Sequence, residues 1–283
     1  MNILSVQSWV SYGHVGNAAA LLPLQRLGIE VWAVNTVQFS NHPGHGDWRG
    51  QVFTGEAVRD VLAGIEARGV LPACDGVLSG YLGDAGIGEA VLDAVAHVRA
   101  VNARALYCCD PVIGDAGRGV FVRPGVAEFL RRRAVPAANV VTPNHFELEF
   151  LTGRELRSLA ALKAAVADVH DMGPGAILVT SLRLDDTPEH RIDLVASDME
   201  SLYRLRTPLL PLRANGAGDV ISALFFAHLL RTGSVAQALE TAGASIFGLL
   251  RRTADAGSNE LLLVAAQDEF VAPSRRFPVE RLA

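Results

Sequence analysis

Residues 213–230, RANGAGDVISALFFAHLL, decide how the rest of the chain is interpreted. Gly216 and Gly218 enclose Ala217, Asp219 follows at once, and the next residues are apolar around most of a helix, which predicts a buried helix. A glycine-rich turn that opens such a helix exposes several backbone N–H groups, and with the helix dipole these form an anion site. Phosphate is the expected anion. The alternative is that Asp219 only caps the helix, because aspartate is common at that position.

Composition limits the kinds of protein that this chain can be. At 283 residues, half of them hydrophobic, it can bury a large core. A formal net charge of −5 argues against an extended nucleic-acid surface, so no nucleic-acid partner is expected. Cys74, Cys108 and Cys109 offer neither a disulfide framework nor a C-x-x-C metal pair, which is typical of a reducing compartment. Without a basic leader or an apolar run of membrane-spanning length, the chain is expected to be soluble and cytoplasmic, with no membrane partner.

Apolar periodicity alternates between strand and helix from the N-terminus onward. This order predicts an α/β protein with a mostly parallel sheet covered on both faces, and the lack of a linker or repeat predicts a single domain over 1–283. The loop 38–48, QFSNHPGHGDW, is expected to be irregular because it is rich in turn formers. Two late strands, 190–197 and 201–207, are expected to pair antiparallel at an edge. The other expected strands are 2–7, 30–36, 74–81, 104–110, 139–144 and 175–181, and the other expected helices are 16–28, 54–69 and 85–101.

Polar residues follow most of the expected strands. In a parallel sheet ligands bind at the carboxyl ends of the strands, so these residues are expected to meet at one site. They are Ser8, Tyr12 and His14 after the first strand, Asn41 and His42 after the second, Tyr81 and Asp84 after the third, Asp110 and Asp115 after the fourth, and Thr142, Asn144 and Glu147 after the fifth.

Three of these residues have the chemistry of a magnesium site. Mg²⁺ keeps several waters and uses few protein oxygens, so Asp110, Asn144 and Glu147 could hold the ion through water. If Pro143 opens a helix, Asn144 and Glu147 share one of its faces. The alternative is that Glu147 is a first-turn residue favoured by the dipole and that Asp110 lies in a simple turn. The histidines lack metal-ligand spacing, so zinc is not expected.

A series of motifs runs in a fixed order along nearly the whole chain: ILSVQSWVSYGHVGNAAALLPLQRLG (3–28), VNTVQFSNHPGHGDW (34–48), YCCDPVIGDAGRG (107–119), VTPNHFELEFLTG (141–153), NGAGDVISALF (215–225) and ELLLVAAQDEF (260–270). This series gives the chain a resemblance to the pyridoxal kinases of the ribokinase superfamily. It implies a three-layer α/β/α sandwich that is usually homodimeric and transfers the γ-phosphate of ATP to the 5′-hydroxyl of pyridoxal. Mg²⁺ is the implied cofactor and ATP the co-substrate, and the use of a monovalent cation is left open.

The resemblance also implies a role for individual residues. Asp219 would be the base that takes the hydroxyl proton, while N–H groups of Gly216, Ala217 and Gly218 hold the developing negative charge. Residues 115–119 match a flexible flap over ATP. The other implied sites are Ser8, His42 and Tyr81 around the pyridine ring, Asp110, Asn144 and Glu147 at the metal and phosphates, and Asp115, Thr142, Thr180 and Ser181 on the nucleotide side.

One loop departs from the family pattern. Relatives usually carry Thr-Gly-Tyr or Thr-Gln-Tyr after FSNH, whereas this chain has Pro43, Gly44 and His45. Proline has no hydroxyl for the substrate and no backbone N–H, so substrate preference is open at this point. Two alternatives therefore stand beside a pyridoxal kinase: a kinase for another hydroxymethyl compound, such as a hydroxymethylpyrimidine or a sugar, and a non-catalytic vitamer-binding protein.

Overall fold

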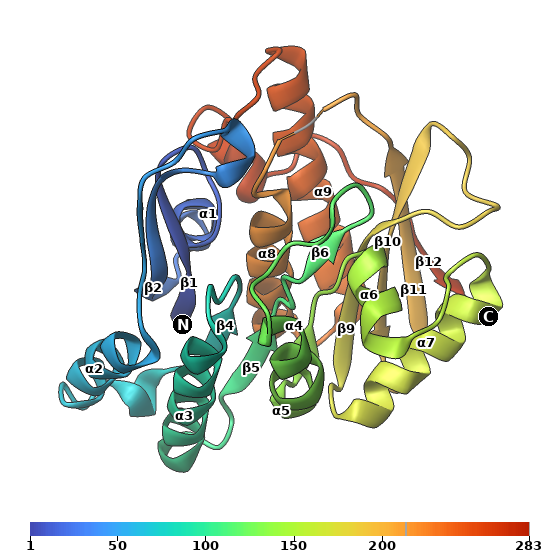
Figure 1. Ribbon diagram of the computed structural model, residues 1–283. Coiled ribbons are helices and arrows are strands. Elements are labelled where there is room, and N and C mark those ends of the chain that lie inside the picture. The colour runs from blue at the N-terminus through green and yellow to red at the C-terminus, as the bar shows by residue number, and fades with distance from the viewer. Residues whose placement is uncertain (213, 283) are drawn as a thin grey trace.

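The computed structural model describes residues 1–212 and 214–282 and is built around one ten-stranded sheet (Figure 1). The strand order is β12-β11-β10-β9-β8-β5-β4-β1-β2-β3. Its strands are β1 (Asn2–Tyr12), β2 (Glu30–Asn41), β3 (Gly50–Val52), β4 (Gly76–Ser79), β5 (Leu106–Cys109), β8 (Val140–Val141), β9 (Ala176–Leu182), β10 (Arg191–Asp198), β11 (Leu202–Pro208) and β12 (Val279–Leu282). A separate hairpin consists of β6 (Gly114–Asp115) and β7 (Gly119–Val120).

The centre of the sheet is parallel and its edges are antiparallel. Strands β2, β1, β4, β5, β8 and β9 pair in parallel, whereas β10, β11 and β12 on one side and β3 on the other run antiparallel to their neighbours. The expected mostly parallel sheet is thus confirmed, as is the antiparallel pairing of the two late strands. Those strands are not the edge, however, because the C-terminal strand β12 pairs outside β11.

Helices cover both faces of the sheet, which gives the three layers of the expected α/β/α sandwich (Figure 1). Helices α1, α8 and α9 pack on one face, and α2 to α7 pack on the other. The helices are α1 (Asn17–Arg26), α2 (Gly55–Glu66), α3 (Ala85–Val101), α4 (Val126–Phe129), α5 (Val135–Ala137), α6 (His145–Thr152), α7 (Leu159–Met172), α8 (Ala217–Thr232) and α9 (Val235–Asp255), with 3-10 turns η1 (Pro43–His45), η2 (Leu71–Ala73) and η4 (Gln267–Phe270) and a π-helical turn η3 (Leu130–Ala134).

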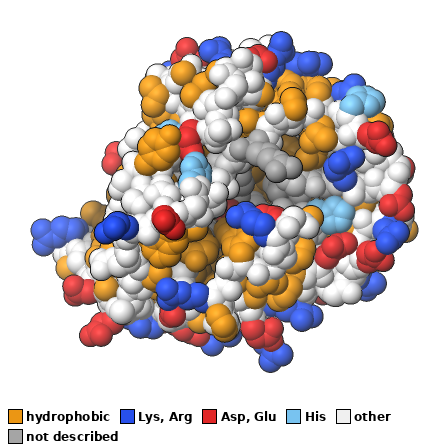
Figure 2. Space-filling view, turned by 45° about the horizontal axis from the view of Figure 1, so that its top comes forward, with side chains coloured by type: hydrophobic (Ala, Val, Ile, Leu, Met, Phe, Trp, Pro, Cys, Tyr) orange, Lys and Arg blue, Asp and Glu red, His pale blue; other side chains and the backbone are white. Residues whose placement is uncertain are grey.

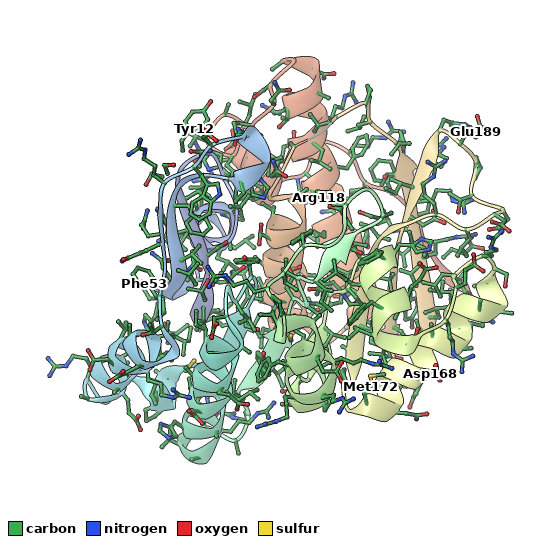
Figure 3. All side chains as sticks on the ribbon, viewed as in Figure 1. Tyr12, Phe53, Arg118, Asp168, Met172 and Glu189 are labelled. Carbon is green, nitrogen blue, oxygen red and sulfur yellow. The ribbon has the colours of Figure 1, made fainter. Side chains whose placement is uncertain are left out.

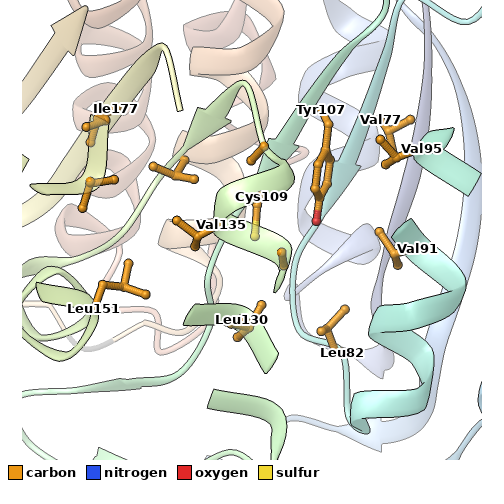
Figure 4. Packing of buried hydrophobic residues seen from close by; sticks show 14 of the residues in the cluster. Val77, Leu82, Val91, Val95, Tyr107, Cys109, Leu130, Val135, Leu151 and Ile177 are labelled. Atoms are coloured by element: carbon orange, nitrogen blue, oxygen red, sulfur yellow. The ribbon is translucent and has the colours of Figure 1, made fainter. Parts of the chain in front are cut away.

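The strands serve two cores because alternate side chains point to opposite faces. In β5, Cys108 packs with α1, α8 and α9, while its neighbour Cys109 packs with the helices of the other face. Figure 4 shows Cys109 and Tyr107 in this second core, beside Leu130 and Val135. Residues that adjoin in sequence thus belong to different cores, which is why the buried strands carry unbroken apolar runs.

The first two strands are longer than predicted. β1 continues to Tyr12 and β2 to Asn41, so the prediction of an irregular loop is wrong for residues 38–41. The two strands pair over their full length across a bulge between Gln7 and Trp9, and β3 pairs with the far part of β2. A small third core of Val10, Val15, Val37 and Phe39 accounts for the extension, because alternate apolar residues there bury one face. The extension forms a wall beside the carboxyl end of the sheet.

Candidate active site

A cavity of about 320 Å³ lies at the carboxyl end of the parallel strands. It brings together most of the residues that the sequence singled out: Ser8, His42, Tyr81, Asp110, Asp115, Thr142, Asn144, Glu147, Thr180, Gly216, Gly218 and Asp219. Ala217 and Ser181 lie instead on an adjoining cavity of about 220 Å³, which shares Thr180 and Gly218 with the first. The strand-end rule therefore predicted where this set of residues meets, but four residues expected at the same site do not line either cavity: Tyr12, His14, Asn41 and Asp84.

Gly216 makes the turn that opens α8. It adopts φ +89° and serves as the N-cap, with no side chain capping the helix. A Cβ added there would lie 1.8 Å from the carbonyl oxygen of His14, so only glycine fits. The first N–H groups of an α-helix have no partner within the helix, and here they lie at the wall of the larger cavity. The turn has the form of an anion site.

Asp219 lies in the first turn of α8 and is not its cap. Its side chain lines the cavity, and burial is the main cause that raises its pKa to about 6, although a hydrogen bond from the backbone of Gly16 lowers it. Gly16 in turn packs on Ser8, because a Cβ there would lie 2.3 Å from the Ser8 hydroxyl oxygen. A carboxylate with a pKa near neutral, set beside an anion site, is suited to accept a proton during a reaction.

Asp110 and Glu147 add two carboxyl groups to the cavity, and both are more fully buried than Asp219. Burial raises the pKa of Asp110 well above its usual range, and the charges of Glu147 and Asp219 raise it further. Burial likewise raises the pKa of Glu147 to about 7, against hydrogen bonds from three backbone N–H groups. A cation bound among these three acids would stabilise their ionised forms.

Asn144 and Glu147 form a capping box at the start of α6. The Asn144 side chain accepts a hydrogen bond from the Glu147 N–H at 2.9 Å, and Oε2 of Glu147 accepts from the Asn144 N–H at 2.9 Å. Oε1 of Glu147 accepts from Ile113 at 2.9 Å, and the Asn144 amide donates to the Gly114 carbonyl at 2.8 Å. Asn144 is therefore the N-cap, and Pro143 lies just before the helix. Both side chains hold the turn that leads into the β6–β7 hairpin.

The donor set around Asp110 fits a hard cation better than that around the capping box. Its carboxylate lies near the hydroxyl groups of Thr142 and Ser222, and all of these are oxygen donors of the kind that Mg²⁺ prefers. The side chains of Asn144 and Glu147 already hydrogen-bond backbone groups, which leaves only part of their acceptor capacity for water around an ion. Among residues 1–212 and 214–282, no three His, Cys, Asp or Glu side chains are grouped so that they could hold a metal ion directly.

His42 lies at the opposite wall, on the turn before η1. Its Nδ1 accepts a hydrogen bond from the Gly44 N–H at 3.0 Å. Burial lowers the pKa of His42 to about 4, helped by the charges of Arg118 and His45, so the ring is neutral at pH 7. Because Nδ1 is the acceptor, the proton sits on Nε2, which is then available as a donor. Tyr81, whose pKa burial raises, and Pro43 lie on the same cavity.

The β6–β7 hairpin lies in front of α8 (Figure 1), and Figure 3 labels Arg118 on it. Asp115 accepts hydrogen bonds from the N–H groups of Gly117 at 3.0 Å and Arg118 at 2.8 Å, and from the Arg118 guanidinium at 2.7 Å. Desolvation opposes these bonds, yet together they lower the pKa of Asp115. The Arg118 guanidinium also stacks on Phe121, 4.6 Å from the ring centre. Arg118, which belongs to the predicted flap, and Phe121 line the cavity, and neither had been named individually as a site residue.

Other parts of the cavity wall were missed as well. The wall residues Val10, Val37 and Phe39 come from the extended parts of β1 and β2. Asn215 immediately precedes the glycine turn of residues 216–218, which we call the anion turn. The alternation of apolar residues in 31–39, VWAVNTVQF, is the signal that could have extended β2 over them. Figure 2 shows the molecule with the top of Figure 1 turned toward the viewer. On this face acidic and basic side chains are interspersed, and hydrophobic side chains gather in patches.

The smaller cavity has an apolar wall built by α8, α9 and strands β10 and β11. Its lining residues include Ile192, Leu194, Ile221, Ile246 and Phe247. Ser181, at its edge, adopts φ +53°, a left-handed backbone conformation that non-glycine residues rarely occupy. Such strain is often found at ligand sites. Two adjoining cavities that share Thr180 and Gly218 suit two ligands that meet near Gly218.

The fold and the site together define the class of ribokinase-like kinases of small molecules. Among solved structures, that of the pyridoxal kinase from Leishmania donovani in complex with ADP and pyridoxamine superposes with a TM-score of 0.93 at 30% identity, covering 100% of this chain and 99% of that one. The family described as phosphomethylpyrimidine kinase matches residues 71–263. Curated relatives named pyridoxal kinase PdxY are 61% identical in Granulibacter bethesdensis, over 98% of both chains, and 56% identical in Rubrobacter xylanophilus, over 100% of this chain and 98% of that one. The chain therefore belongs to the pyridoxal kinase family, within the wider group that the phosphomethylpyrimidine kinase family describes.

Proposed function

We propose that this protein transfers the γ-phosphate of ATP to the 5′-hydroxyl of pyridoxal, giving pyridoxal 5′-phosphate and ADP. The observation that carries the proposal is Asp219, a carboxylate with a pKa of about 6 in the first turn of α8, beside N–H groups of that turn that have no partner within the helix. Full-length similarity to relatives named pyridoxal kinase PdxY supports pyridoxal as the substrate. The complex of the Leishmania donovani enzyme with ADP and pyridoxamine supports the pairing of a nucleotide with a vitamer.

In this mechanism Asp219 accepts the proton of the 5′-hydroxyl as its oxygen forms a bond to the γ-phosphorus. The bond from that phosphorus to the β–γ bridging oxygen breaks, and ADP leaves. The N–H groups of Gly216, Ala217 and Gly218 stabilise the negative charge on the transferred group. Phosphoryl transfer asks little covalent chemistry of a protein, so holding the two substrates in line provides most of the rate enhancement.

The substrate ring is proposed to lie between the β1–β2 wall and His42. Val10, Val37 and Phe39 offer apolar contacts to it, while Ser8, Tyr81 and the Nε2 proton of His42 offer hydrogen bonds. The nucleotide is proposed to lie across Thr142, Thr180 and Ser181, with its base in the apolar cavity of Ile221, Ile246 and Phe247. Asp115 and the hairpin that bears it would close over the phosphates.

Mg²⁺ is proposed as the cofactor. Asp110 is the residue best suited to hold it, with Asn144 and Glu147 acting through water from the capping box. When bound, the ion would neutralise charge on the phosphates. Asp110, with the hydroxyl groups of Thr142 and Ser222 nearby, would supply oxygen atoms around the ion. Glu147 hydrogen-bonds the backbone of the turn that follows Asp110.

A homodimer in the cytoplasm is also proposed. The dimer rests on family resemblance, and the mass of one chain is 30.1 kDa, so light scattering at about twice that mass would support it. Cys74, Cys108 and Cys109 are buried and free, which suits a reducing compartment. Within the described residues, no helix has the length and apolar character needed to cross a membrane.

A coupled ATP-consumption assay with pyridoxal tests the function. We expect ADP and pyridoxal 5′-phosphate to form in equal amounts, with the latter detected by its absorbance. Turnover of a hydroxymethylpyrimidine under conditions where pyridoxal is left unchanged would favour a different hydroxymethyl kinase. Tight binding of a vitamer without ADP formation would favour a non-catalytic binding protein.

A further inference from the structure

Glu260 connects segments that are far apart in the sequence. It follows α9, and its carboxylate oxygen Oε1 is buried. That oxygen lies 2.9 Å from Nε2 of His45, the last residue of η1, and the two side chains are 20% and 26% exposed. The contact has the distance of a hydrogen bond without its alignment, so it is an attraction between charged or polar groups and not a directed bond. In Figure 1, η1 and the segment after α9 lie side by side.

The end of β1 completes this junction. Gly13 adopts φ +89°, and a Cβ added there would lie 2.4 Å from Oε2 of Glu260. The carboxylate therefore packs directly on the backbone at Gly13, where the positive φ favours glycine and a larger residue would displace the carboxylate. The Tyr12 ring approaches the His45 ring edge-on at 6.4 Å, and Figure 3 labels Tyr12 at this end of the strand.

The junction reaches both sides of the cavity. On the substrate side, η1 carries Pro43, and its first turn is closed by the bond from Gly44 to the His42 ring. On the anion side, the amide nitrogen of Asn215 lies 3.5 Å from Nε2 of His45, and Asn215 immediately precedes Gly216. His45 thus lies between η1, on the substrate side, and the anion turn.

The turn η1 itself has few contacts, although the loop around it is held by the hydrogen bond from Asn41 to the Asp47 carbonyl and by the stacking of Trp48 on Phe39. It is three residues long and contains no buried residue. A short exposed segment of this kind loses conformational entropy when it is ordered, so its position depends on a few side-chain contacts. If those contacts are present before the substrate arrives, binding does not have to supply the ordering.

We propose that His45 and Glu260 are positioning residues that fix η1 against the anion turn, and that they set the affinity for the alcohol substrate without taking part in phosphoryl transfer. This inference rests on the proposed kinase function. Neither residue lines the substrate cavity, so their effect passes through His42 and Pro43. The inference predicts a change in substrate KM that leaves kcat unchanged, since a weakened binding contact acts on both ground and transition states.

The test uses Glu260→Gln, His45→Gln and the double variant. Glutamine keeps the size of Glu260 beside Gly13 and removes its charge. The control is the pair His97 and Glu66, whose Nδ1 and Oε2 also lie 2.9 Å apart but which is 57% and 47% exposed and joins α3 to α2 away from the cavity. Its variants are His97→Gln and Glu66→Gln. The measurements are KM for pyridoxal and for ATP, kcat, and pyridoxal affinity without ATP by calorimetry.

We expect each single variant to raise the pyridoxal KM and dissociation constant by about tenfold, the change that 1.4 kcal/mol produces, with kcat and the ATP KM unchanged. The double variant should be no worse than either single one, because the two residues act as a pair. The control variants should match the wild type. Unchanged pyridoxal affinity in His45→Gln, additive losses, or a fall in kcat alone would overturn the inference. His45 is on an exposed turn, so its variant remains informative even if Glu260→Gln folds poorly. Failure of the wild type to phosphorylate pyridoxal would instead reject the proposed function.

Discussion

Replacing Asp219 by Asn separates a catalytic base from a residue that only stabilises a helix end. Gly216 is the N-cap of α8, and the amide oxygen of asparagine can still accept a backbone hydrogen bond such as the one from Gly16, so the loss in stability should be small and mainly the dipole contribution, about 0.3–1 kcal/mol. The loss of a general base lowers turnover by about 10²–10⁴-fold, which is about 3–5 kcal/mol in activation free energy. We therefore expect a large fall in kcat in a protein that still folds and binds ATP.

The assay compares kcat, thermal stability and ATP affinity in Asp219→Asn and in a control. Glu56→Gln is a matched control because Glu56 is also an acid in the first helical turn, at the exposed start of α2. It should lose a similar small amount of stability and no activity. Turnover of Asp219→Asn within a few fold of the wild type would refute the assignment and leave Asp219 as a helix-end residue.

The pH profile gives a second readout of the same prediction. A base must be deprotonated to act, and burial raises the pKa of Asp219 to about 6. The value of kcat/KM, which reports the free enzyme, should therefore rise with pH through about 6 and level off above it. Asp219→Asn should lack this rising limb. Its survival in the variant would assign the limb to another group.

Three further predictions concern other residues of the site and core. Glu147→Gln should raise the magnesium requirement and the ATP KM more than the pyridoxal KM. It should also lower stability by about 1–3 kcal/mol, because an amide cannot accept all the backbone hydrogen bonds that the carboxylate accepts. An unchanged magnesium titration would remove Glu147 from the site. Pro43→Thr should tighten pyridoxal binding by no more than about tenfold, since a neutral hydrogen bond is worth about 0.5–1.5 kcal/mol, and should leave the ATP KM unaltered; a larger effect on ATP would mean that η1 is misassigned. Burial lowers the pKa of His228 to about 4, so as pH falls below 6.5 the unfolded chain binds a proton at this residue that the folded protein does not. The free energy of unfolding therefore falls, by at most about 3 kcal/mol, between pH 6.5 and 4. Urea unfolding of His228→Gln should show a smaller fall in this free energy over that range, and an identical slope would contradict the prediction.

The sequence predicted which residues meet at this cavity because its signals are local. A glycine turn, an aspartate and an apolar helix adjoin in the chain, and each strand end names its own polar residue. The rule that parallel strands end at one edge then brings Ser8, Asp110 and Thr142 together without any knowledge of side-chain contacts. No such rule exists for pairs such as His45 and Glu260. They meet because two loops of unrelated length approach each other, and neither loop has a periodic pattern.

Prediction was weaker for strands whose extent depends on pairing with a neighbouring strand. The residues HPGHGDW contain strong turn formers, and their influence concealed the strand alternation that continues to Asn41. β12 was missed for a related reason, since four residues near the chain end gain strand structure only by pairing with β11. Tertiary pairing decided the outcome in both places.

The Asn144 and Glu147 pair shows how a structural role and a functional role can use the same residues. An Asn-x-x-Glu spacing fits a capping box as well as a metal shell, and both interpretations follow from the sequence. In the structure the pair caps α6, and its remaining atoms hold Ile113 and Gly114, the residues that lead from Asp110 into the hairpin. A metal ion at Asp110 would therefore be bound beside a turn whose shape depends on Glu147. Loss of Glu147 would then disturb the metal and the hairpin together, whether or not its carboxylate ever faces the ion.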